Sequence, residues 1–260
     1  MTFVENSTDK SRSNIFSSCL VRMNEEWGSV LEPVVIKPGQ VLSYEDARAT
    51  ILYFPINCVV ADLVSPTSWF AAAVQETDQR TDDSIQVGIY GPEDVVGLPG
   101  LLSVGISGRR SVVEFGGHAL RCQVSAARRI MERDPGSREV IHSYVALLLE
   151  ELGQQAAAEQ RLDVSDRVAA YLWRMVQASG ENVITITHAH ISKRLGARRP
   201  SVTESINALV KLGIIEQIDR GRILIKSFDE IGKIVKRAWP AMQNTREVFR
   251  SRMISVAIAS

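Results

Sequence analysis

The stretch from residue 187 to 226 constrains the fold of this chain more than any other part of the sequence. Thr187 can cap a helix by accepting hydrogen bonds from the amides of the first helical turn. Ile191 and Leu195 then fall on one face of that helix, four residues apart. Gly196 supplies a tight turn of the kind that separates the two helices of a helix-turn-helix. The stretch therefore predicts that motif.

A second helix is predicted to begin near Arg199 and to end at Gly213. Pro200 is tolerated in its first turn because the missing N–H has no helical partner there, and glycine is a common helix C-cap. The expected buried stripe is aliphatic and consists of Val202, Ile206, Leu209 and Val210. The expected outward residues are polar and consist of Arg198, Arg199, Ser201, Thr203, Glu204 and Asn207.

A short hairpin is predicted after the second helix. Apolar residues alternate with polar ones from 214 to 218 and again from 223 to 225, and Asp219-Arg220-Gly221 forms the turn between them. This hairpin is the wing of a winged helix, and it carries Arg220 and Arg222.

The polar outward face predicts binding to double-stranded DNA. A helix that enters the major groove needs guanidinium or short polar side chains near its N-terminus, where base edges lie within reach. The same N-terminus presents free amides towards phosphate. A winged helix used only for protein contacts is the alternative, and the arginines at the turn and on the wing argue against it.

These forty residues closely resemble the C-terminal domain of the Crp/Fnr superfamily of bacterial transcription regulators. The matching positions are Ile191, Leu195, Gly196, Arg199, Val202, the run from 212 to 215, and the run from 221 to 223. The resemblance implies that Arg199 and Glu204 face bases, and that Thr187, Arg198 and Ser201 lie at the DNA backbone. The whole set of candidate DNA-binding residues is Thr187, His188, Arg198, Arg199, Ser201, Thr203, Glu204, Asn207, Arg220 and Arg222.

Two positions depart from the family pattern and leave the operator sequence open. Many members have Glu directly after the arginine, where this chain has Pro200. Others have Arg where this chain has Glu204.

The N-terminal half has a different pattern, with short β-branched runs separated by Gly and Pro. It predicts an antiparallel β-barrel or jelly roll and an α+β protein. The expected strands cover 34–36, 41–42, 50–54, 58–60, 85–89, 94–97, 111–115 and 119–122. Residues 1–14 are expected to be disordered, 15–31 to form lead-in helices, and 65–84 to form a hairpin with a mobile tip.

This region also resembles the sensor barrel of the same superfamily. In its cyclic-nucleotide binders a Gly-Glu pair holds the ribose, and an Arg before a small residue holds the phosphate. Here Gly97 is followed by Leu98, which cannot accept the ribose hydrogen bond, whereas Arg109 or Arg110 ahead of Ser111 could match the arginine. These five residues are the candidate effector pocket. The leucine argues against a cyclic nucleotide, although a cyclic-nucleotide-dependent regulator remains an alternative, and Arg109-Arg110 can also be a solvated loop.

A long helix is predicted from 137 to 162, after a short helix from 125 to 133. Ile141, Val145, Leu148 and Leu152 repeat with the spacing of a coiled-coil seam. Leu147 and Leu149 form a second apolar face that is expected to rest on the barrel. The seam predicts a homodimer, and a two-fold dimer would read two half-sites about one DNA turn apart.

The expected domains are a tail with lead-in helices at 1–31, the sensor barrel at 32–136, the dimerisation helix at 137–162 and the winged helix with a basic extension at 163–260. The uneven distribution of charge along the chain indicates that its two halves have different functions. Residues 161–260 hold 17 Lys and Arg against 9 Asp and Glu, whereas residues 1–160 hold 13 against 21. A basic part favours phosphate contact and an acidic part does not. The role of 236–260 is left open.

Other classes of protein find little support in the sequence. Cys19, Cys58 and Cys122 are scattered and do not predict an iron–sulfur cluster. His118 or His142 could serve as a haem ligand but is more often a core or surface residue. Neither a catalytic constellation nor a nucleotide-binding loop is present, so an enzyme is not expected and no cofactor is predicted.

No apolar run spans a membrane and no secretory signal is evident, which predicts a cytoplasmic protein. The expected partners are DNA, a second copy of the chain and RNA polymerase. The sensor has either an effector of unknown identity or none.

Overall fold

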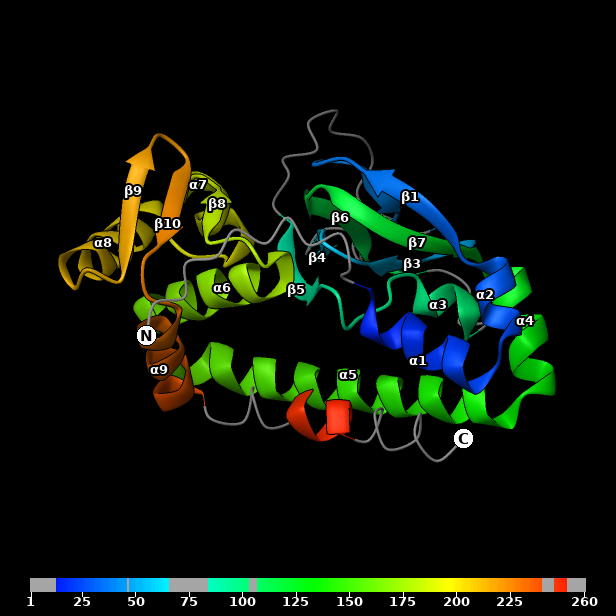
Figure 1. Ribbon diagram of the computed structural model, residues 1–260. Helices are drawn as coiled ribbons and strands as arrows, with labels where there is room; N and C mark the ends of the chain where they lie inside the picture. The colour runs from blue at the N-terminus through cyan, green and yellow to red at the C-terminus, as the bar shows by residue number, and fades with distance from the viewer. Residues whose placement is uncertain (1–12, 46, 66–83, 103–106, 240–245, 252–260) are drawn as a thin grey trace, which may run out of the picture.

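The computed structural model describes residues 13–45, 47–65, 84–102, 107–239 and 246–251. Two antiparallel sheets with four helices form the N-terminal part, a long helix follows, and a helical part with a small sheet completes an α+β protein (Figure 1). The predicted disorder of residues 1–12 and the predicted hairpin at 66–83 lie outside the described residues.

The seven N-terminal strands among the described residues form two separate sheets. One has the order β1-β7-β3 and the other has the order β2-β6-β4-β5. The strands are β1 (Glu32–Ile36), β2 (Val41–Ser43), β3 (Ile51–Pro55), β4 (Val59–Val64), β5 (Ile85–Tyr90), β6 (Arg110–Phe115) and β7 (Gly117–Gln123). The jelly-roll alternative is therefore the better description, and the closed barrel is wrong for the described strands.

The strand expected at 94–97 does not form. Val96 makes only an isolated pairing with Tyr53, with N–O distances of 3.0 and 2.8 Å. Gly97 adopts a φ of 97°, a left-handed conformation that turns the chain into the short helix α3 (Leu98–Leu101). The apolar residues of this run belong to a turn that packs on the sheets.

Three further helices cover one end of the sheets: α1 (Ile15–Met23), α2 (Glu26–Val30) and α4 (Val124–Arg133). The shared core includes the fully buried side chains of Phe16, Leu20, Trp27 and Phe54. Asn14 is buried and ordered rather than disordered as expected. Its side chain caps α1 by accepting from the Ser17 amide at 2.7 Å and donates to the Pro55 and Asp94 carbonyls.

The long helix α5 (Pro135–Arg161) runs beneath the molecule in Figure 1. It begins two residues before the expected Ser137. Asp134 caps it by accepting from the amides of Gly136 and Ser137, and proline suits the first turn of a helix. Residues 246–251 are helical and lie along α5.

The C-terminal part contains α6 (Val164–Ser179), β8 (Val183–Thr185), α7 (His188–Arg194), α8 (Arg199–Lys211), β9 (Ile215–Asp219), β10 (Arg222–Ile225) and α9 (Phe228–Ala238). Its sheet has the order β8-β10-β9. Val202, Ile206 and Leu209 are buried as expected, whereas Val210 is 37% exposed and does not belong to the stripe. The core of this part also includes Val59 and Ile89 from the N-terminal sheets, so the two parts pack directly on each other.

Candidate functional site

The helix-turn-helix is held by local hydrogen bonds. The Thr187 hydroxyl accepts from the His190 amide at 3.2 Å and caps α7. Gly196 has a φ of 57° at the turn, and the Ser192 hydroxyl donates to the Ala197 carbonyl at 2.7 Å. These contacts fix the angle at which α8 leaves the turn.

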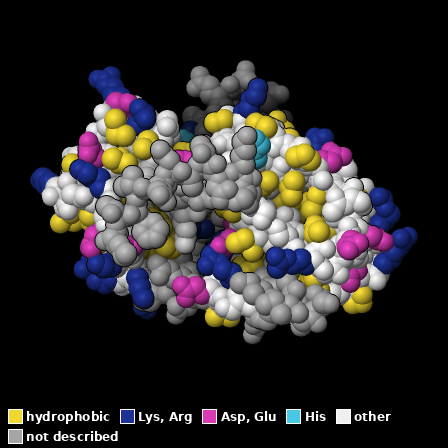
Figure 2. Space-filling model, viewed as in Figure 1, with side chains coloured by type: hydrophobic (Ala, Val, Ile, Leu, Met, Phe, Trp, Pro, Cys, Tyr) yellow, Lys and Arg dark blue, Asp and Glu magenta, His cyan; other side chains and the backbone are white. Residues whose placement is uncertain are grey.

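The outer face of α8 is polar and open to solvent. Arg198, Arg199, Glu204 and Asn207 are exposed, and Ser201 and Thr203 are half-buried. Arg198 and Arg199 make no hydrogen bond or ion pair with any residue that the structure describes, and the same is true of Arg220 on the wing. In Figure 2, Lys and Arg side chains project from the end of the molecule formed by α8, α9 and the wing. These guanidinium groups are available to phosphate or to base edges.

Three other predicted DNA-binding residues have partners within the domain. His188 Nδ1 and Thr203 Oγ1 lie 3.1 Å apart and join α7 to α8. Burial and the neighbouring positive charge of Arg199 lower the pKa of His188. Arg222 pairs with Asp219 at 3.3 Å across the hairpin turn.

The predicted dimer seam faces the interior of its own chain. Ile141 is 1% exposed in the N-terminal core, Val145 and Leu148 pack against the same core, and Leu152 lines a cavity. Leu149, which was expected to rest on the barrel, is 66% exposed. Leu147 packs on the N-terminal core as expected, and Leu149 does not. Two faces of α5 share the same spacing, and the single chain buries only one of them.

The face of α5 that remains exposed carries smaller residues. His142, Ala146, Leu149, Gly153 and Ala156 are all exposed and are spaced by four, three, four and three residues. We refer to these five residues as the α5 stripe. This spacing is that of a coiled-coil seam.

The five candidate effector residues have contacts of their own within the chain. Leu98, the first residue of α3, is buried in the N-terminal core. Ser111 instead donates to a carboxylate oxygen of the buried Asp62 at 2.6 Å, and Arg109 lies 3.8 Å from the other oxygen. Tyr90 also donates to Asp62, at 2.9 Å. An internal carboxylate thus holds the serine and one arginine that would otherwise be available to a ligand phosphate.

The other arginine and the glycine of this candidate pocket also have structural contacts. Arg110 donates to the Ser84 hydroxyl at 3.2 Å. A Cβ atom added at Gly97 would lie 2.5 Å from the Ile51 carbonyl oxygen, so the glycine allows a close backbone approach.

An ion-pair cluster joins the helix-turn-helix to the N-terminal sheets. The Glu114 carboxylate on β6 lies 2.8 Å from His190 Nε2 and 2.6 Å from Arg194 Nη2, both on α7. Glu114 and Arg194 are buried. Burial by itself would raise the pKa of Glu114, but the hydrogen bond from His190 and the charge of Arg194 hold it below its usual value. The sequence carries no signal for this contact, since its partners lie about eighty residues apart.

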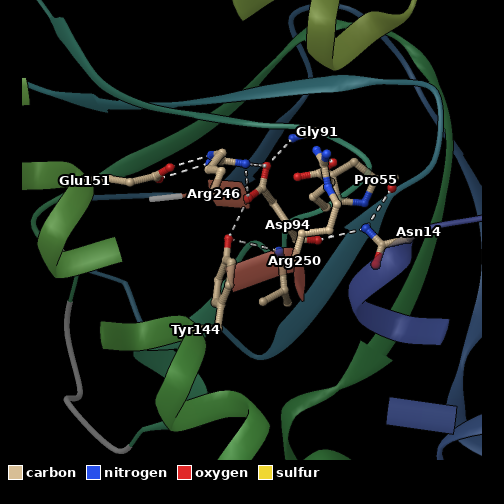
Figure 3. Close-up of polar contacts among 10 residues, drawn as sticks. Asn14, Pro55, Gly91, Asp94, Tyr144, Glu151, Arg246 and Arg250 are labelled. Carbon is tan, nitrogen blue, oxygen red and sulfur yellow. Dashed lines mark hydrogen bonds and ion pairs between the residues drawn. The ribbon is translucent and has the colours of Figure 1, made fainter. Parts of the chain in front are cut away.

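A second buried cluster ties the C-terminal segment to the rest of the chain (Figure 3). Arg246 Nη1 lies 3.0 Å from Asp94 Oδ1, and Arg246 Nη2 donates to Glu151 Oε2 at 3.0 Å. Tyr144 donates to Asp94 at 2.9 Å, and Arg250 pairs with Glu93. Burial would lower the pKa of Arg246, but the two carboxylates raise it well above its usual value. The sequence shows that the extension at 236–260 is basic, but it does not indicate that two of these arginines form ion pairs with the rest of the chain.

Metal-binding clusters and membrane-spanning helices are both absent from the described part of the chain. No three His, Cys, Asp or Glu side chains there come together in a way that could hold a metal ion. None of the described helices has both the length and the apolar character to cross a membrane.

Comparisons with known proteins agree with this geometry. Residues 166–234 match the family model of the Crp-like helix-turn-helix domain. No curated protein matches the chain.

Solved structures extend the likeness to the whole fold. FixK2 from Bradyrhizobium japonicum has a TM-score of 0.61 and 15% identity, covering 79% of this chain and 97% of its own. A CRP/FNR-family transcriptional regulator from Thermus thermophilus has a TM-score of 0.57 and 15% identity, covering 79% and 98%. The c-di-GMP responsive regulator CLP from Xanthomonas campestris has a TM-score of 0.57 and 13% identity, covering 78% and 98%. The chain therefore contains a Crp-like helix-turn-helix domain in its C-terminal part and shares its overall fold with these Crp/Fnr-type regulators.

Proposed function

We propose that the chain acts in the cytoplasm as a homodimer that binds a palindromic operator and contacts RNA polymerase there. The observation that carries the operator proposal is the pair of solvent-exposed guanidinium groups of Arg198 and Arg199 at the N-terminus of α8, neither of which has a partner among the described residues. A recognition helix enters the major groove with this end.

Each polar group of the helix-turn-helix and the wing then has a defined role. Arg199 and Glu204 face base edges, and Arg198 contacts the DNA backbone together with Ser201 and Thr187. Arg220 and Arg222 on the wing contact phosphate. Asn207 lies one helical turn further along the exposed face, and His188 and Thr203 support the two helices from behind.

The α5 stripe supports the homodimer. Its small residues would allow two copies of α5 to approach closely, and Leu149 would be the largest apolar contact. Because the predicted seam is used within the chain, the α5 stripe is the face of this helix that remains for a partner. A two-fold interface there would present two copies of α8 to two half-sites.

Operator binding is tested by selecting duplexes from a random library and measuring their dissociation constants at several salt concentrations. The wild type should lose affinity steeply with salt, because phosphate contacts release counterions. Arg199→Ala should weaken binding by about 1–3 kcal/mol and relax specificity at one base position. Arg133→Ala, at an exposed position of α4 in the N-terminal part, is the control and should bind like the wild type. Equal affinity of Arg199→Ala and wild type would show that α8 is not docked as proposed.

The same assay tests a cyclic-nucleotide effector. Cyclic AMP and cyclic GMP should leave operator affinity unchanged, because Asp62 already binds Ser111 and lies beside Arg109. Operator binding that requires either nucleotide would overturn this account of the sensor.

The dimer is tested by light scattering. Leu149→Glu places a charge in the α5 stripe and should give a monomer, since two such charges would face each other. Arg161→Glu also adds a carboxylate to α5 at an exposed position, but it lies outside the stripe and should leave the dimer intact. A dimeric Leu149→Glu chain would place the interface elsewhere.

A further inference from the structure

A cavity of about 310 Å³ lies where four parts of the chain meet. Its walls come from β5, from α5, from α6 and from the C-terminal segment, which contributes Trp239, Arg246 and Arg250. This volume is in the range of small-molecule sites. The cavity includes only Arg109 of the five candidate effector residues.

Most of the cations around the cavity are already paired. Arg246 is shared between Asp94 and Glu151, and Arg250 pairs with Glu93. Arg109 lies beside Asp62. Glu247, also in the wall, is exposed.

Arg174 is the exception among these cations. It comes from α6, lines the cavity, and makes no hydrogen bond or ion pair with any described residue. Its neighbours Trp173 and Met175 are buried in the core, so the helix position is firmly held. Burial lowers the pKa of Arg174, although Glu151 opposes this, and a guanidinium remains charged in proteins. The Arg174 side chain is half-buried. A cation held partly away from water without a partner would be stabilised by an anion in the cavity.

The rest of the lining is apolar or neutral. Ile89, Leu148, Leu152 and Trp173 supply apolar surface. The indole Nε1 of Trp239 is buried and has no hydrogen-bond partner among the described residues. Three amide side chains, Gln154, Gln155 and Gln177, complete the wall. These groups suit a flat apolar body that also offers an acceptor to the indole.

We propose that this cavity binds a small organic anion whose carboxylate, sulfonate or phosphate group meets Arg174 and whose flat apolar body packs beside Trp173 and Trp239. Its walls come from the sensor sheets, the long helix and the DNA-binding domain. A bound anion would therefore bias the arrangement of these parts. Binding itself does not depend on the proposed function, whereas its effect on operator affinity rests on that function.

The fluorescent probe 8-anilino-1-naphthalenesulfonate tests the site, because it combines a sulfonate with an aromatic body. The full chain should bind it saturably, with one probe per chain. Arg174→Gln should weaken binding by about tenfold, and Arg174→Lys should recover part of the loss. Arg237→Gln is the control and should bind like the wild type. Equal binding by wild type and Arg174→Gln would overturn the proposal.

A second measurement uses only the wild type and so does not depend on how the variants fold. 1-Naphthoate should displace the probe at much lower concentration than 1-naphthamide, which has the same shape but no charge. Displacement at equal concentrations would show that the cavity selects apolar bodies rather than anions, against the proposal.

The operator assay separates the two proposals. Saturating 1-naphthoate should shift operator affinity of the wild type and not of Arg174→Gln. A chain that binds operator but no anion would refute the cavity proposal alone, and a chain that binds the anion but no operator would refute the proposed function alone.

Discussion

The arginines on the exposed face of α8 and those of the C-terminal segment have opposite surroundings. We call the first region the reading face, and we call the cluster of Asp94, Glu151 and Arg246 the junction. Arg198 and Arg199 on α8 are exposed and have no partner among the described residues, whereas Arg246 lies between Asp94 and Glu151. An exposed guanidinium exchanges water and counterions for phosphate at little cost to the fold. A buried guanidinium cannot leave without stranding its carboxylates. One residue type therefore serves recognition in the first region and structure in the second.

The largest change in the free energy of unfolding is expected from removing the ion pairs that Arg246 makes with Asp94 and Glu151. Arg246→Met would leave Asp94 and Glu151 without their cation and should lower the free energy of unfolding by about 3–5 kcal/mol. Urea denaturation followed by tryptophan fluorescence measures this change. Arg237→Met removes an exposed arginine and should change stability by about 0.5 kcal/mol or less. A similar small loss for both variants would remove the distinction between the two regions.

Glu114 tests whether a buried carboxylate also holds the two parts of the chain together. Glu114→Gln should lower the free energy of unfolding by about 2–3 kcal/mol, since Arg194 remains buried without its counter-charge. Glu216→Gln, in an exposed pair with Lys226, should cost about 0.5 kcal/mol or less.

The pH dependence gives this prediction a sign. Because the folded-state pKa of Glu114 is below its usual value, its contribution is present above the unfolded-state pKa and is lost as the pH falls through the lowered one. The stability difference between wild type and Glu114→Gln should therefore shrink in acid. A difference that is constant down to about pH 3 would contradict the assignment.

On the reading face, substitution should change affinity and leave stability alone. Arg198→Ala should weaken binding to all DNA sequences alike and reduce the salt slope by about one, because a phosphate contact carries no sequence information. Its unfolding midpoint should match that of the wild type. A change of base preference in this variant would instead place Arg198 at a base edge.

The smallest effect is expected at the cap of α7. Thr187→Ala removes the acceptor for the His190 amide and should lower the free energy of unfolding by about 1 kcal/mol. Thr187→Ser keeps an acceptor and should lose less. Equal stability of all three chains would mean that the cap contributes little here.

Local signals made the helix-turn-helix predictable. A cap at Thr187, a glycine turn at Gly196 and aliphatic spacing in α8 involve residues only a few positions apart, so the pattern and the structure agree. The N-terminal strands were found for the same reason. The run at 94–97 failed because Gly97 turns the chain where its apolar composition suggested a strand.

Tertiary packing decided the features that depend on residues far apart in the sequence. Two faces of α5 have the same spacing, and only the docked sheets show that Ile141 faces inward and Leu149 outward. Nothing in the sequence near Arg194 or Arg246 indicates that these arginines are paired. The fold places Glu114 beside Arg194 and Asp94 beside Arg246. The sequence by itself determined the DNA-reading motif, because its information is local. Only the fold decided which charges are paired, because pairing depends on contacts that no short pattern encodes.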